Sequence, residues 1–136
     1  MGNAGNISAY WRGYKQYGRG LPRLLGGQAA GAAPIVLGRV VEKPETLATA
    51  IRIGNPARWR QAAEALDESG GIITAVSDDD ILAAWHMLAQ RERVWVEPAS
   101  ATGLAALMEE IERGEIDRAG TKDNRGGEHT RGEERR

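Results

Sequence analysis

Residues 71–91, GIITAVSDDDILAAWHMLAQR, decide the fold class of this chain. Residues 71–76 are mostly apolar and β-branched and are bounded by glycine, which is typical of a short buried strand. Ser77 follows directly and Asp80 stands three positions later, a spacing that predicts a capping box at the start of a helix. The helix is expected over about residues 78–91, because one stripe of it is apolar: Ile81, Leu82, Trp85 and Leu88.

The same alternation of strand and helix extends in both directions from this unit. Further helices are expected over about residues 7–17, 44–53, 57–68 and 98–113, and further strands over 23–28 and 94–96. This alternation is typical of α/β proteins. We therefore expect about three or four short strands in a partial parallel sheet flanked by helices. In the last helix, the side chains expected to point inward are Leu104, Leu107, Met108 and Ile111.

Composition restricts the kinds of partner that this chain can have. Its 136 residues suffice for one modest domain, and its net charge of −1 gives no electrostatic reason to expect nucleic acid or an anionic membrane as partner. It has no cysteine, so disulfides and thiolate metal sites are excluded. No signal peptide is expected after Met1, and no stretch approaches the about 18 apolar residues of a membrane helix. A cytoplasmic protein is the expectation.

The chain divides into two parts of different composition. Residues 1–119 carry every aliphatic and aromatic side chain of the protein, whereas residues 120–136 contain none. A segment without such side chains cannot bury enough apolar surface to offset its ordering entropy. We expect one domain over residues 1–119 and a disordered polar tail over residues 120–136.

The segment GNAGN near the start of the chain is a candidate anion site. Glycines let successive backbone N–H groups turn toward one anion, and the following helix adds the partial positive charge of its N-terminus. The candidate binding residues are Gly2, Asn3, Ala4, Gly5 and Asn6. The pattern is neither a Walker nor a Rossmann fingerprint, so a flexible Gly/Asn-rich segment is the alternative interpretation.

Three other segments contain weaker signals. Glu97 stands between a predicted strand and a helix, where α/β proteins bind ligands, although an ordinary helix start explains it as well. The small residues 29–33 permit either helix packing or a close approach to a ligand. Arg52, Arg58 and Arg60 could meet a phosphate, or pair with Asp67 and Glu68. Neither histidine, His86 or His129, has a partner at ligand spacing, so no metal site is expected.

Five segments together resemble successive blocks of the threonine synthase family. They occur in the family's order and cover about residues 2–118. The segments are GNAGNISAYWRGYKQY (2–17), LPRLLGGQAAGAAPIV (21–36), EKPETLATAIRIGNPARW (42–59), ESGGIITAVSDDDIL (68–82) and VEPASATGLA (96–105). The resemblance implies part of the large domain of a fold type II pyridoxal-phosphate enzyme.

The family converts O-phosphohomoserine and water to L-threonine and phosphate. The resemblance implies pyridoxal 5'-phosphate as cofactor, with its phosphate held by the GNAGN loop, and Glu97 and residues 29–33 near the cofactor ring or substrate. It implies that residues 52–56 border the site. It also implies a possible homodimer.

The sequence departs from the family at its catalytic lysine. In the family this lysine lies well before the GNAGN loop, and none of Lys15, Lys43 and Lys122 matches its surroundings. The resemblance therefore assigns no catalytic residue to this chain. We expect a fragment that is inactive alone, with Met1 in place of a valine and a tail from about residue 121 produced by a frameshift.

Two alternatives stay open at this point. The chain could be a stand-alone module that binds a phosphate ligand or a protein partner. It could also be a fragment of a related threonine or serine dehydratase, although the residues after the GNAGN loop and the block at 42–59 resemble threonine synthase more closely.

Overall fold

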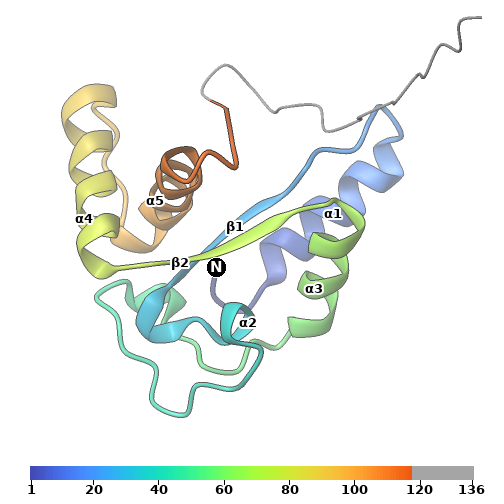
Figure 1. Ribbon diagram of the computed structural model, residues 1–136, viewed down its shortest axis with the longest axis horizontal. Coiled ribbons are helices and arrows are strands. Elements are labelled where there is room, and N and C mark those ends of the chain that lie inside the picture. The colour runs from blue at the N-terminus through green and yellow to red at the C-terminus, as the bar shows by residue number, and fades with distance from the viewer. Residues whose placement is uncertain (118–136) are drawn as a thin grey trace, which may run out of the picture.

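The computed structural model describes residues 1–117, and their centre is a two-stranded parallel sheet (Figure 1). Strand β1 (Leu25–Ala29) pairs with β2 (Ile72–Val76) in a register that runs from Leu25↔Ile72 to Ala29↔Val76. Both strands were expected, and β1 begins two residues later than residue 23. The predicted boundary at residue 119 and the predicted tail lie outside the described residues.

Helices cover both faces of this sheet. Helices α4 (Asp78–Met87) and α5 (Pro98–Glu112) lie on one side of it, and α1 (Gly5–Tyr17) and α3 (Trp59–Glu68) lie on the other (Figure 1). Short turns complete the described chain: α2 (Pro34–Leu37), the 3-10 turns η1 (Ala30–Ala32) and η2 (Thr49–Ile51), and the π-helical turn η3 (Leu88–Glu92). The predicted α/β class with a partial parallel sheet flanked by helices is confirmed.

The strand–helix unit of residues 71–91 forms as its sequence predicts. The Ser77 hydroxyl oxygen accepts from the Asp80 backbone N–H at 3.1 Å, and the Asp80 carboxylate accepts from the Ser77 N–H at 3.3 Å. These bonds satisfy N–H groups that have no partner within the helix. Helix α4 then continues through η3 to residue 92, close to the predicted end.

Helix α5 packs on the sheet through smaller side chains than predicted. Its buried face consists of Ala101, Thr102, Ala105, Ala106 and Glu110, whereas the four larger side chains that were expected inward are only partly buried. The cause is the closeness of the helix to β1 at Gly27. A Cβ atom at Gly27 would lie 2.7 Å from the Thr102 carbonyl oxygen, so no larger side chain fits between the two elements.

A second, smaller core lies on the opposite face of the sheet. It is formed by buried residues of the GNAGN loop, α1 and α3, with partly buried side chains from β2 and the connections packed against it: Ala4, Ile7, Ala62 and Leu66, with Met1, Leu24, Ile35 and Ile73. The GNAGN loop therefore belongs to the packed interior at Ala4, which is 2% exposed. The alternative of a loose Gly/Asn-rich segment does not describe this loop.

The predicted helix over residues 44–53 is wrong. This segment is an extended connection with one 3-10 turn, η2. Its backbone groups form hydrogen bonds with side chains instead of with one another as in a helix. The Asp78 carboxylate accepts from the Thr46 hydroxyl at 2.5 Å and from the Leu47 N–H at 2.9 Å. The Arg52 guanidinium donates twice to the Thr46 carbonyl, at 3.0 and 2.6 Å, so these groups have partners without a helix.

The predicted strand over residues 94–96 is also wrong. The Val94 N–H donates to the Leu88 carbonyl at 3.1 Å, and the Trp85 indole donates to the Val96 carbonyl at 2.6 Å. These backbone groups are bonded to the preceding helix rather than to a neighbouring strand. The described residues therefore form two strands instead of three or four. None of their helices has both the length and the apolar composition that crossing a membrane requires.

Candidate functional site: the GNAGN loop and its cavity

The GNAGN loop turns sharply into α1. Ala4 has a left-handed backbone (φ 61°) and immediately precedes Gly5, the first residue of the helix. No side chain caps this helix start, and the N–H groups of a first turn have no partner within the helix. The loop therefore presents backbone donors and the positive end of a helix dipole at one place.

These donors border a cavity of about 470 Å³. Its lining comes from three parts of the chain that are distant in sequence: Met1 to Asn6, then Ala50, Ile51 and Ile53 around η2, then Glu97, Ala99 and Ser100 at the start of α5. The structure thus brings the predicted loop residues together with Glu97. The small residues 29–33 do not line this cavity, since Gly31 packs instead against the Glu45 carbonyl oxygen, 2.0 Å from where its Cβ would lie.

The loop is held in place by residues 50–58. A Cβ at Gly2 would lie 3.1 Å from Ile53 Cδ1 and 3.2 Å from the Ala50 carbonyl oxygen, so the backbone there is in close contact with η2. Asn3 accepts two hydrogen bonds from the segment that leads into α3: its backbone carbonyl from the Arg58 N–H at 3.2 Å, and its side-chain oxygen from the Ala57 N–H at 3.3 Å. Of residues 52–56, which were expected to border the site, Ile53 contacts the loop and lines the cavity.

Charge in the cavity comes from few groups. No lysine or arginine side chain is among its lining residues, and Glu97, exposed at the N-terminal end of α5, is the one charged side chain there. The ammonium group of Met1 donates to the Gly27 carbonyl, and burial lowers its pKa to about 6. An anion in this cavity would thus be held mainly by backbone donors.

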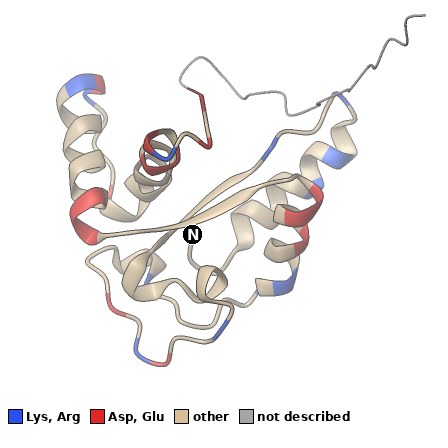
Figure 2. Ribbon diagram, in the orientation of Figure 1, with Lys and Arg blue, Asp and Glu red and all other residues tan. Residues whose placement is uncertain are grey.

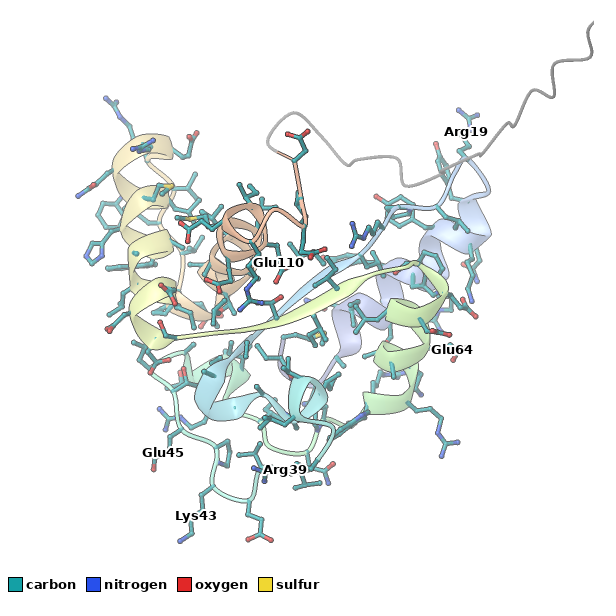
Figure 3. All side chains as sticks on the ribbon, in the orientation of Figure 1. Arg19, Arg39, Lys43, Glu45, Glu64 and Glu110 are labelled. Atoms are coloured by element: carbon teal, nitrogen blue, oxygen red, sulfur yellow. The ribbon has the colours of Figure 1, made fainter. Side chains whose placement is uncertain are left out.

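The lysines are placed away from this cavity. Lys15 Nζ lies 2.7 Å from the Glu68 carboxylate on α3, and Lys43 is exposed at the tip of the connection between α2 and η2 (Figure 3). Lys122 lies outside the described residues. Glu68 also accepts from the Trp11 indole, so its partners in the described structure are Lys15 and Trp11 rather than one of the arginines considered as an alternative. Figure 2 shows Lys and Arg spread over several elements, with no concentration around the sheet.

Two buried polar residues were missed by the sequence analysis. Gln28 is fully buried in β1, and its side-chain oxygen accepts from the N–H groups of Ile35 and Val36 at 3.1 and 3.2 Å. Glu110 of α5 is 2% exposed and accepts from the Thr74 hydroxyl and from Arg113 (Figure 3). The periodicity of Glu110 with Thr102 and Ala106 was the available signal, since all lie on the helix face that contacts the sheet.

His86 has a local structural role. Its Nδ1 lies 2.9 Å from the Leu82 carbonyl and its ring meets the Trp85 ring edge-on, with centroids 5.0 Å apart. Within residues 1–117 no group of three or more His, Asp or Glu side chains could hold a metal ion. His129 lies outside the described residues.

This architecture defines a class: an α/β protein with a candidate anion site where a loop enters a helix. The family model named "Pyridoxal-phosphate dependent enzyme" matches residues 1–121. The chain belongs to the pyridoxal-phosphate dependent enzyme family. The cofactor predicted from the resemblance is therefore the cofactor of this family.

Individual relatives carry a more specific name. The chain is 54% identical over 125 residues to a threonine synthase of Halalkalibacterium halodurans, and 55% identical over 126 residues to one of Mycobacterium tuberculosis. Each alignment covers 89% of this chain. It covers 35% of each relative, so the chain spans about a third of the length of these proteins. The predicted resemblance to threonine synthase is confirmed.

Solved structures share the fold. A maize serine racemase superposes with a TM-score of 0.68 at 23% identity, over 83% of this chain and 35% of its own. The T.th. threonine deaminase superposes with a TM-score of 0.67 at 25% identity, over 83% of this chain and 38% of its own. The predicted fold class, part of a fold type II pyridoxal-phosphate enzyme, is confirmed.

The residues present fit the phosphate group of this cofactor. The left-handed turn at Ala4 and the uncapped start of α1 supply several N–H donors on one side of the cavity. The close contact of Gly2 with residues 50–53 leaves little room for a side chain at this position of the loop. A dianion needs donors that converge without side-chain bulk, and this arrangement provides them.

Proposed function

We propose that this chain is part of a threonine synthase and holds the phosphate of pyridoxal 5'-phosphate through Gly2, Asn3, Ala4, Gly5 and Asn6. The observation that carries the proposal is the left-handed turn at Ala4, which directs the loop and the uncapped start of α1 into one cavity. The reaction would convert O-phosphohomoserine and water to L-threonine and phosphate, a step of amino-acid biosynthesis.

When bound, the cofactor supplies an electron sink that stabilises carbanions of an amino-acid substrate. The residues of this chain bind and orient it. Backbone donors of the loop fix the phosphate, η2 contacts the loop at Gly2, and Glu97 contributes a carboxylate to the lining of the cavity. No catalytic residue is assigned among residues 1–117, because none of the cavity's lining residues is a lysine.

Sequence identity favours threonine synthase over the dehydratase alternative. Identity to named threonine synthases reaches 54–55%, whereas identity to the structurally similar threonine deaminase is 25%. The whole enzyme's substrate differs between these proteins although their fold does not, so the fold alone does not separate them. We further propose a cytoplasmic protein that works as a homodimer, on the family resemblance.

Binding of the purified chain to pyridoxal 5'-phosphate and to pyridoxal, measured by calorimetry, tests the proposed site. Pyridoxal 5'-phosphate should bind at least about tenfold more tightly, because pyridoxal lacks the group that the loop holds. Equal affinity for the two compounds would contradict the assignment. Binding of inorganic phosphate as tight as that of the cofactor would favour the stand-alone phosphate module.

A second measurement tests the expected lack of activity. The chain should form no threonine from O-phosphohomoserine, and borohydride treatment should leave the cofactor unattached, because Lys15 is paired with Glu68 and Lys43 is remote. Covalent labelling of either lysine together with turnover would overturn this part of the proposal.

A further inference from the structure

We infer that an exposed tyrosine stripe on α1 is the surface on which a second copy of this chain docks, with the two α1 helices antiparallel across a twofold axis. The stripe consists of Tyr10, Gly13, Tyr14 and Tyr17. The inference rests on the homodimer of the proposed function and names a surface for it. This surface is separate from the GNAGN loop, because the stripe and the loop's cavity share no lining residue.

The stripe contains every tyrosine of the protein. Tyr10, Tyr14 and Tyr17 are 62%, 45% and 67% exposed, and their spacing of four and three residues places them on one side of α1 (Figure 1). Together with Ala9 and Gly13 they line a groove of about 310 Å³ that has no charged side chain in its lining. A contiguous apolar surface rich in tyrosine and poor in charge is typical of a protein interface.

Gly13 lies inside this groove, between the tyrosines. Glycine is one of the least favourable residues in the interior of a helix. Apart from its own helical turn, nothing in the described structure lies within 4 Å of the position that a Gly13 Cβ would occupy. The packing of the chain on itself therefore does not require a glycine here. The open space over Gly13 allows a ring from another molecule to approach the helix backbone closely.

The stripe is self-complementary along the helix. For a twofold axis that passes between residues 13 and 14, Tyr10 of one copy faces Tyr17 of the other, and Gly13 faces Tyr14. An isologous interface requires this property, because every contact in it occurs twice. The ring of Tyr14 in each copy would then enter the space over Gly13 of the other copy.

The exposed area of the stripe predicts a weak and reversible dimer. A tyrosine side chain buries about 150–250 Å² in full, so the exposed parts of the three amount to about 350 Å² per copy. Two copies would bury about 700 Å² from tyrosine alone, and the surrounding groove brings the total toward the about 1,000 Å² at which specific interfaces begin. We expect a dissociation constant of about 10–500 μM.

Sedimentation equilibrium of the purified chain measures this association. Tyr14→Lys places a charge in the groove and Gly13→Gln fills it, so each should weaken dimerisation at least about tenfold. The matched controls are Gln16→Lys, on the same helix outside the stripe, and Gly103→Gln, at an exposed glycine of α5. Both should leave the dissociation constant within about twofold. The thermal midpoint of dilute Gly13→Gln should not fall, because glutamine favours a helix more than glycine does.

The antiparallel register can be tested directly, since the sequence has no cysteine. In this register residues 10 and 17 of opposite copies are neighbours, whereas the two residues 10 lie about 10 Å apart, beyond the about 7 Å between Cα atoms that a disulfide spans. An oxidised mixture of Tyr10→Cys and Tyr17→Cys chains should yield a mixed disulfide dimer, and each variant alone should yield at least about fivefold less. Equal yields from each variant alone would contradict the antiparallel arrangement.

Two results would overturn the docking surface itself. A chain that stays monomeric up to about 0.5 mM would leave the stripe to a different polypeptide. A dimer that neither Tyr14→Lys nor Gly13→Gln weakens would show that the copies meet through another surface. The affinity for pyridoxal 5'-phosphate should be the same in these variants as in the unchanged chain. Failure of the unchanged chain to bind the cofactor would contradict the proposed site and leave the dimer test intact.

Discussion

At the scale of single residues, Gly27 sets the distance between β1 and α5. The missing side chain lets the helix backbone approach the strand, and a Cβ there would lie 2.7 Å from the Thr102 carbonyl and 3.0 Å from the Ala106 Cβ. This closeness explains why alanines rather than the larger apolar residues of α5 face the sheet. Amphipathic periodicity locates a helix but does not indicate how near its neighbour lies, so the alanines that face the sheet were not predicted, whereas the predicted Leu104 and Met108 do pack against the core.

Replacing Gly27 by alanine should therefore destabilise the fold. We expect a loss of about 1–3 kcal/mol in the free energy of unfolding, since two backbone elements must move apart. Gly103→Ala is the matched control, because Gly103 lies on α5, the helix that packs on Gly27, but has open space around it, so this variant should gain up to about 1 kcal/mol. Urea denaturation of both variants measures the difference, and equal stability would contradict the close packing.

Gln28 illustrates a second residue whose role depends on tertiary contacts. Its oxygen satisfies the N–H groups of Ile35 and Val36, at the start of α2. Gln28→Leu should cost about 1–3 kcal/mol in unfolding free energy, because two N–H groups lose their acceptor in a buried place. Gln16→Leu, at an exposed position of α1, should change stability by less than about 0.5 kcal/mol in the same denaturation experiment.

At the scale of elements, the local sequence predicted the helices and strands whose formation depends on neighbouring residues. The helices α1, α3, α4 and α5 and both strands lie close to their predicted bounds. The segments predicted wrongly, 44–53 and 94–96, are those whose backbone groups bond to distant side chains or to a preceding helix. Asp78, thirty-one positions from Leu47, cannot be recognised as its partner from sequence.

Asp78 should consequently stabilise a loop as well as a helix. Asp78→Ala removes the acceptor for both Thr46 and Leu47, and we expect it to cost about 1–3 kcal/mol more than Asp79→Ala. Both residues are in the first turn of α4 and interact similarly with the helix dipole, so the difference isolates the loop contacts. Similar stabilities in thermal unfolding would contradict this role.

At the scale of the whole molecule, resemblance predicted more than physical pattern did. The GNAGN spacing alone left a loose segment open as an alternative, whereas its neighbours η2 and α5, which form the cavity, lie more than forty residues away along the chain. The order of the five family blocks predicted a cofactor-binding loop, which the GNAGN spacing alone does not predict. Gln28, Glu110 and the contacts of Asn3 were not predicted, because each depends on a partner that only the fold brings near.

The pairing of α1 with α3 should make stability depend on acid pH. Hydrogen bonds from Lys15 and from Trp11 hold the pKa of Glu68 below its ordinary value. The folded state therefore binds this proton less readily than the unfolded state, so the stabilisation is present above the ordinary pKa and is lost as pH falls through the lowered one. Thermal midpoints of Glu68→Gln should fall less steeply below about pH 4.5 than those of the unchanged chain.

No lysine or arginine lines the cavity, so we expect its affinity for an anion to depend only weakly on salt concentration. Mobile salt ions shield full charges on exposed side chains effectively, over a Debye length of about 10 Å at 0.1 M, but shield short-range contacts with peptide N–H groups much less. Cofactor affinity should therefore change less than about threefold between 0.05 and 0.5 M sodium chloride. The selectivity of the loop would then reside in the shape of its backbone, which remains the same at every ionic strength.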